Sequence, residues 1–122
     1  MKLKTGLIGL AAALLLGGVA NAGTLRVVVV EASDVGAYVK ALEDGKALLK
    51  KKGSPSELHV WLARYAGPNA GSVVVSIEYP SLEALAKDDT MMRSDAELSA
   101  WLERLSKIRK IVSDSIYEEL KP

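Results

Sequence analysis

The sequence contains no cysteine and no phenylalanine, and it has one histidine among 122 residues. Without cysteine the chain has no disulfide, no thiolate nucleophile and no cysteine-rich metal centre. A metal shell around one histidine would need carboxylates to complete it, and no group of Asp and Glu has ligand spacing along the chain. A glycine-rich phosphate loop and a Ser-His-Asp signature are missing too. We therefore expect no metal site.

A strong charge of one sign is also missing. Lys and Arg number 16 and Asp and Glu number 15, which leaves a formal net charge of +1. Domains that bind nucleic acid present a basic face or stripe, and helices that lie on membranes are also rich in basic residues. The composition therefore predicts neither nucleic acid nor a membrane surface as a partner.

The long apolar run of the sequence is confined to the N-terminus. Lys2 and Lys4 precede an apolar segment over 7–19, and Ala20-Asn21-Ala22 follows it. A positive start, a short apolar core and small residues before the cut are typical of a secretory signal peptide. A membrane-spanning helix needs about 20 apolar residues, more than this segment has. We expect cleavage after Ala22 and a periplasmic or secreted protein without a stable membrane anchor, the alternative being an uncleaved anchor.

The remaining residues, 23–122, predict a single domain of the α+β class. Segments with alternating or β-branched residues predict strands over 24–32, 57–65, 72–79 and 111–120. Ser33, Ser81 and the sequence Ser94-Asp95-Ala96-Glu97 each resemble a helix start, the second helix ending near Asp89. Trp101 falls on the apolar stripe of the last helix and is expected in the core. The order β-α-β-β-α(α)-β predicts a ferredoxin-like fold, with a four-stranded antiparallel sheet and helices on one face.

The alternation in 57–65 places His59, Trp61 and Tyr65 on one side of its strand. If Tyr65 pairs with Ser72 across a six-residue loop, His59 lies opposite Glu78 and Trp61 opposite Ser76. These side chains would then lie on the sheet face that the helices leave uncovered. By the same parity Arg26 joins this face from the first strand, and Tyr117 joins it from the last.

The uncovered face is therefore the candidate site. His59 and Glu78 are candidates for an acid–base pair, and the alternatives are contact with a ligand without catalysis or a purely structural polar pair. Ligand contacts are expected from Trp61, Ser76, Arg26, Tyr65 and Tyr117, although Trp61 could equally serve as packing at a pocket or subunit wall.

The mature chain resembles the dimeric α/β-barrel superfamily, and within it the NIPSNAP-like and antibiotic-monooxygenase-like small domains. The resemblance is carried by the segments "GKALLKKKGSPSELHVWLARYAGPNAGSVVVSIEYPSLEALAK", "SDAELSAWLERL" and "SIYEEL". It implies a homodimer in which two ferredoxin-like subunits join their sheets into one barrel. Haem-degrading members combine an asparagine, a tryptophan and a ligand histidine in the pocket, and the histidine usually comes from a helix. In this sequence His59 lies on an expected strand and Asn69 in an expected loop. No cofactor is expected.

Two functions from different classes follow. In the first, a periplasmic homodimer binds a small, partly apolar or aromatic molecule in its barrel without a reaction. In the second, a cofactor-independent monooxygenase or isomerase acts on an aromatic, quinol-like substrate through His59 and Glu78. Fold alone does not choose between them.

Overall fold

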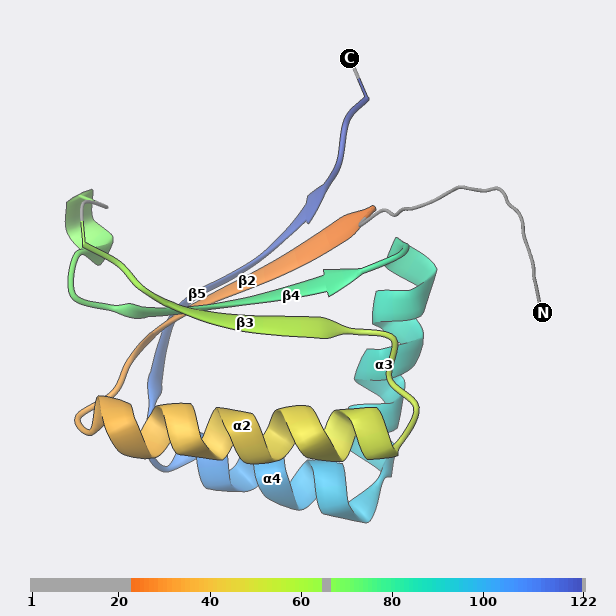
Figure 1. Cartoon of the computed structure of the whole chain (residues 1–122), viewed down its shortest axis with the longest axis horizontal. Helices are drawn as coiled ribbons and strands as arrows, with labels where there is room; N and C mark the ends of the chain where they lie inside the picture. Colours follow the sequence, from red (N-terminus) through yellow and green to blue (C-terminus); the bar gives the residue numbers. More distant parts are fainter. Residues whose placement is uncertain (1–22, 65–66, 122) are drawn as a thin grey trace.

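The computed structural model describes residues 23–64 and 67–121 (Figure 1). The expected signal peptide and Tyr65 lie outside the described residues. The elements follow in the order β2 (Thr24–Glu31), α2 (Val35–Lys51), β3 (Glu57–Leu62), the 3-10 turn η1 (Gly67–Asn69), β4 (Val73–Tyr79), α3 (Leu82–Ser94), α4 (Ala96–Ser106) and β5 (Lys110–Glu118). This order is the one predicted from the sequence.

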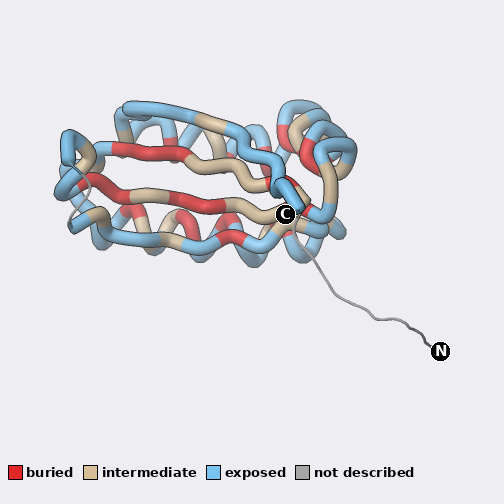
Figure 2. Tube along the Cα trace, turned by 90° about the horizontal axis from the view of Figure 1, so that it is seen from above, coloured by how far each residue is buried: buried red, intermediate tan, exposed pale blue. Residues whose placement is uncertain are grey.

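The strands form one antiparallel sheet in the order β3-β4-β2-β5. Figure 2 shows buried residues along the two central strands and exposed residues along the two outer ones. The valines of β2 suit the central place, because β-branched side chains pack well on a pleated surface with neighbours on both sides. The ferredoxin-like α+β fold is therefore confirmed.

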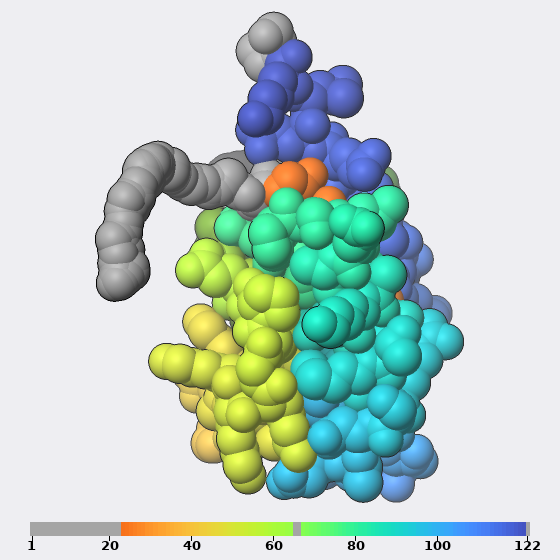
Figure 3. All heavy atoms as spheres, turned by 90° about the vertical axis from the view of Figure 1, so that its right-hand side faces the viewer, coloured from red at the N-terminus to blue at the C-terminus, as the bar shows by residue number. Residues whose placement is uncertain are grey.

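The three α-helices of the described residues lie on one face of the sheet or at its end. Figure 1 shows α2 and α4 side by side below the sheet, with α3 upright at one end. Figure 3 looks at that end, where the atoms of α3 lie above those of α4 and beside those of the turn after α2. Among the described residues no helix combines the length and the apolar character needed to cross a membrane.

Trp101 lies in the core, as predicted, with 3% of its surface exposed. Its indole nitrogen donates a hydrogen bond of 2.8 Å to the backbone oxygen of Ala41 in α2. The ring lies directly against Gly45, where any side chain would overlap it. The absence of a side chain at Gly45 therefore sets how closely α2 and α4 approach.

At two of the helix starts the N-cap lies one residue later than the sequence predicted. Asp34, and not Ser33, caps α2 by accepting a hydrogen bond from the backbone nitrogen of Ala37. Asp95, and not Ser94, caps α4, because α3 continues past Asp89 and includes Ser94. A carboxylate at an N-cap accepts from free backbone N–H groups and also favours the positive end of the helix. Ser81 caps α3 as predicted.

The register of the β3–β4 hairpin corrects the predicted pairing by two residues. Glu57 lies opposite Glu78, His59 opposite Ser76, and Trp61 opposite Val74. The cause is a longer loop: Ala63 pairs with Ser72 through a backbone hydrogen bond of 2.9 Å, and 64–71 form the connection. A slip of two residues keeps every side chain on its face, so the predicted faces of β3 and β4 are right while the partners are wrong.

Candidate functional site

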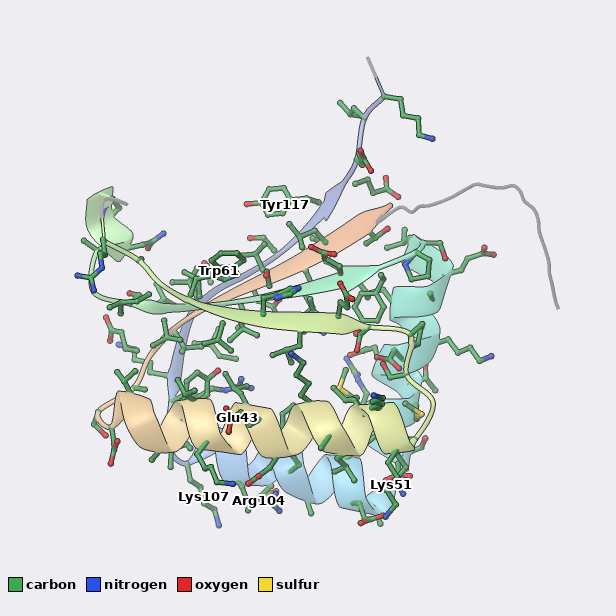
Figure 4. All side chains as sticks on the ribbon, in the orientation of Figure 1. Glu43, Lys51, Trp61, Arg104, Lys107 and Tyr117 are labelled. Atoms are coloured by element: carbon green, nitrogen blue, oxygen red, sulfur yellow. The ribbon has the colours of Figure 1, made fainter. Side chains whose placement is uncertain are left out.

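The sheet has one covered and one open face. Alignment across the four strands places on the open face Leu25, Val27, Val29, Glu57, His59, Trp61, Val74, Ser76, Glu78, Ser113, Ser115 and Tyr117. Figure 4 shows the labelled side chains of Trp61 and Tyr117 on the side of the sheet away from the helices. More than half of the surface of each is exposed, at 57% and 55%.

His59 has two carboxylates near it on the open face, where the edge strand β3 pairs with β4. Its Nε2 lies 3.8 Å from the Oε1 of Glu57, two residues earlier on the same strand. Glu78 lies directly opposite Glu57 on the neighbouring strand β4. The His59 nitrogen and one carboxylate oxygen from each of Glu57 and Glu78 all lie within 4.8 Å of one another. The predicted His59–Glu78 pair therefore becomes a group of three. Glu57 was missed, although its spacing of two from His59 could have indicated it.

Trp61 and Ser76 form the other contact among the predicted site residues. The indole nitrogen of Trp61 donates a hydrogen bond of 2.8 Å to the hydroxyl of Ser76. The rings of Trp61 and His59 are tilted at 46° with their centroids 6.1 Å apart. Tyr117 lies apart from this group, because β4 and β2 stand between β3 and β5 at roughly 4.8 Å per strand.

Arg26 does not lie on the open face, which corrects the predicted parity of the first strand. It lies opposite Ile77 and Ile116 on the face toward the helices. Its guanidinium donates two hydrogen bonds to the carboxylate of Asp114, at 3.0 and 2.7 Å, and lies 3.6 Å from Asp89. The hydrogen bonds from Arg26 lower the pKa of Asp114, and the same contact raises the pKa of Arg26.

A cavity of about 80 Å³ lies between the sheet and the helices. Every helix and strand contributes to it, and its apolar lining includes Leu42, Leu58, Val75, Ile77, Trp101 and Leu105. Arg26, Asp114, Arg109 and Tyr79 add polar groups. The cavity thus combines an apolar body with a few polar side chains, the composition typical of small-molecule sites.

Two of these polar residues are held by hydrogen bonds in or near the core. Arg109 donates a hydrogen bond of 3.2 Å to the hydroxyl of Tyr38, and its buried Nε has no partner among the described residues. Tyr79 donates to the buried carboxylate of Asp88 at 2.9 Å. The pKa of Tyr79 is raised far above its ordinary value, mainly because the hydroxyl is buried and to a smaller extent because it donates this hydrogen bond to Asp88. Tyr79 is therefore a neutral hydrogen-bond donor at all ordinary pH values.

The Arg26–Asp114 pair predicts a pH dependence of stability. Asp114 has a pKa below the value of about 3.9 that an unfolded Asp has. Its contribution to stability is therefore complete above about pH 4 and is lost as the pH falls through the lowered folded-state pKa. We expect Asp114→Asn to reduce stability at pH 7 by roughly 1 kcal/mol, since the pair is partly exposed.

The measurement is thermal unfolding of both proteins by circular dichroism at pH values from 7 to 3. The difference in Tm between them should shrink below pH 4. Asp44→Asn is the control, because Asp44 pairs with Lys40 on the exposed surface of α2. A difference that stays constant down to pH 3 would contradict the assigned role of the pair.

Solved structures share this fold at low sequence identity. SnoaB, a cofactor-independent oxygenase from Streptomyces nogalater, is 8% identical over 84% of this chain and 97% of its own, with a TM-score of 0.63. A NIPSNAP family protein from Agrobacterium tumefaciens is 15% identical over 84% of this chain and 89% of its own, with a TM-score of 0.58. A NIPSNAP domain protein from Burkholderia xenovorans is 15% identical over 81% and 92%, also at 0.58.

No protein-family model and no curated protein matches the sequence. Identities of this size show a common fold and leave the chemistry open. The chain therefore has the ferredoxin-like fold that NIPSNAP-family domains and SnoaB share.

Proposed function

We propose that this protein is exported and acts as a homodimer that binds a small, partly apolar or aromatic molecule. The observation that carries the proposal is the cavity between the sheet and the helices, which is lined by apolar side chains and a few polar ones. Export is supported by the signal-like segment 1–22 in the sequence.

The open sheet face supports the homodimer. It presents the exposed rings of Trp61 and Tyr117 beside the valines of β2 and β4. No described helix covers this face, so a second copy placed against it would remove aromatic surface from water. We expected the ligand pocket here, but the cavity on the helix side is the better enclosed place for an apolar molecule.

The size of the cavity limits the ligand. A water needs at least about 10–15 Å³, and a dry cavity of about 150 Å³ holds benzene. The cavity volume of about 80 Å³ therefore lies between the volume that one water needs and the volume that holds benzene. Met92 in the lining is a flexible side chain that can adapt its shape to a bound group. A single ring with one polar substituent is the kind of molecule that this cavity can take after small side-chain movements.

The polar side chains indicate what the substituent would contact. The guanidinium groups of Arg26 and Arg109 each carry several N–H donors, whereas the single hydroxyl hydrogen of Tyr79 is already donated to Asp88. An acceptor oxygen on the ligand, such as a phenol or carboxylate oxygen, is the complement of these donors.

Fluorescence tests the proposal, because the chain has two tryptophans, one on each side of the sheet. In Trp61→Phe, the remaining Trp101 lines the cavity. Titration of this variant with phenol or benzoate should change the Trp101 emission in a saturable way. Val75→Ile adds a methylene inside the cavity and should weaken binding several-fold, whereas Val74→Ile on the opposite face should not.

A saturable response of Trp61 in Trp101→Phe, together with none of Trp101 in Trp61→Phe, would move the ligand to the open face and overturn the proposed cavity. Equal affinities in Val75→Ile and Val74→Ile would do the same. Absence of any saturable binding by single-ring ligands would remove the proposed function.

The alternative function is a cofactor-independent monooxygenase or isomerase for an aromatic, quinol-like substrate, with His59 and Glu78 as its acid–base pair. Both residues lie on the open face, on neighbouring strands. The His59 side chain is 45% exposed, so the described residues of one subunit do not shield a substrate there from water. The cavity therefore supports binding better than the open face supports this reaction.

A further inference from the structure

We propose that Glu57, His59 and Glu78 form a binding site for a divalent transition-metal ion of the zinc type. Among the described residues these three bring an imidazole nitrogen and two carboxylate oxygens within 4.8 Å of one another. The inference is independent of the proposed ligand in the cavity, since the two sites lie on opposite faces of the sheet.

The geometry is close to that of a metal-ligand set. Zinc binds imidazole nitrogen and carboxylate oxygen at about 2.0–2.2 Å in a tetrahedral arrangement, so two ligand atoms lie roughly 3.4 Å apart. The distance of 3.8 Å between His59 Nε2 and Glu57 Oε1 is near this value already. Glu78 can come closer by rotation of its side chain, because this side chain has three rotatable bonds and is partly exposed.

The backbone holds the three positions in a fixed relation. Glu57 and His59 are two residues apart on β3 and point the same way, while Glu78 on β4 lies directly opposite Glu57. The two strands are joined by regular backbone hydrogen bonding over six pairs of residues. A site built on neighbouring strands needs only side-chain rotation to close, and little ordering of backbone.

The negative charges of Glu57 and Glu78 also favour a bound cation. Like charges directly opposite across two strands destabilise a sheet, and Glu57 and Glu78 form such a pair. Among the described residues no Lys or Arg forms an ion pair with either carboxylate. A second copy packed over the open face would remove these carboxylates from water, which is costly for an unpaired charge. A bound cation would offset both effects.

The ligand types select among cations. Calcium and magnesium prefer oxygen ligands alone, whereas imidazole favours zinc, copper and nickel. One imidazole and two carboxylates supply three ligands, and water completes a tetrahedral shell. The sequence alone predicted no metal site, because Glu57, His59 and Glu78 become one group only when β3 pairs with β4.

The test is a titration of untagged, EDTA-treated protein with zinc chloride, followed by calorimetry and by NMR. The chain has one histidine, so the imidazole resonances report on His59 alone. We expect one zinc ion per chain, with a saturable shift of the His59 signals, and no such shift with magnesium. His59→Ala and Glu78→Gln should each weaken zinc binding by at least about tenfold.

Glu43→Gln is the matched control, because Glu43 is an exposed carboxylate on α2, on the other side of the sheet from the group (Figure 4). It should bind zinc as the natural protein does. Three outcomes would overturn the proposal: no saturable zinc binding, equal affinity in His59→Ala, or equal binding of magnesium and zinc. Circular dichroism of each variant separates lost binding from lost folding, and Glu78→Gln provides a second variant if His59→Ala unfolds.

Discussion

Gly45→Ala should destabilise the protein by about 3 kcal/mol, although alanine is a better helix former than glycine. A methyl group at Gly45 would overlap the six-membered ring of Trp101. Trp101 is held in place by its hydrogen bond to Ala41 and by the surrounding core, so the ring cannot move away freely. The helices α2 and α4 must then separate, and the hydrogen bond and the packing are lost together.

Gly36→Ala in the same helix is the control. A methyl group there meets only the side chain of Asp34, at 3.6 Å, which is an ordinary contact. This variant should gain about 0.5–1 kcal/mol from helix propensity and from reduced freedom of the unfolded chain. Thermal unfolding measures both, and a loss of 3 kcal/mol corresponds to a fall in Tm on the order of 15 °C for a domain of this size. Similar Tm values for the two variants would contradict a packing role for Gly45.

Asp88→Ala should cost about 3 kcal/mol. The buried carboxylate of Asp88 accepts hydrogen bonds from the hydroxyls of Tyr79 and Ser54, at 2.9 and 2.8 Å. It thereby ties α3 to the end of β4 and to the segment between α2 and β3. Removal of the acceptor leaves the buried hydroxyl of Tyr79 without its partner, at about 1–3 kcal/mol, and it also removes one hydrogen bond of the Ser54 hydroxyl, which still contacts Ser56.

The neighbouring carboxylate provides the comparison. Asp89 pairs with the exposed Arg93 one turn along α3 and more distantly with the partly buried Arg26. Asp89→Ala should therefore cost less than about 1 kcal/mol. The double variant Asp88→Ala/Tyr79→Phe should recover part of the loss, because it removes a donor together with its acceptor. Chemical denaturation of the natural protein, of these three variants and of Tyr79→Phe alone tests this, and a loss in the double variant equal to the sum of the two single losses would contradict the assigned hydrogen bond.

The fold could be predicted because its main signals are local. Valines and alternation mark the strands, and the apolar stripe through Trp101 marks the last helix. The faces of β3 and β4 were also predictable, since alternation alone decides them. The register was not, because the connection over 64–71 contains two more residues than the expected turn. Arg26 was misplaced because its partner Asp114 lies 88 residues away in the sequence.

The candidate site was predicted in part. The sequence placed His59, Trp61, Ser76 and Glu78 on one face, and the structure has them there. The cavity could not be predicted, because the residues that line it have the spacing of ordinary core residues. Hydrophobic periodicity tells which side chains point inward and does not tell whether they fill the space between the layers.

The central place of β2 has a consequence for how the chain folds. β2 comes first in the described sequence, yet both of its neighbours in the sheet, β4 and β5, come later, and β5 comes last. Sheets whose strands pair over a long distance in sequence form slowly, because the entropy of closing a long loop is lost before the contacts between the strands stabilise the structure. A newly made chain therefore carries this valine-rich segment with at least one edge unpaired until synthesis is nearly complete. During that interval the segment is the part of the molecule most exposed to aggregation, and the part that a chaperone has most reason to hold.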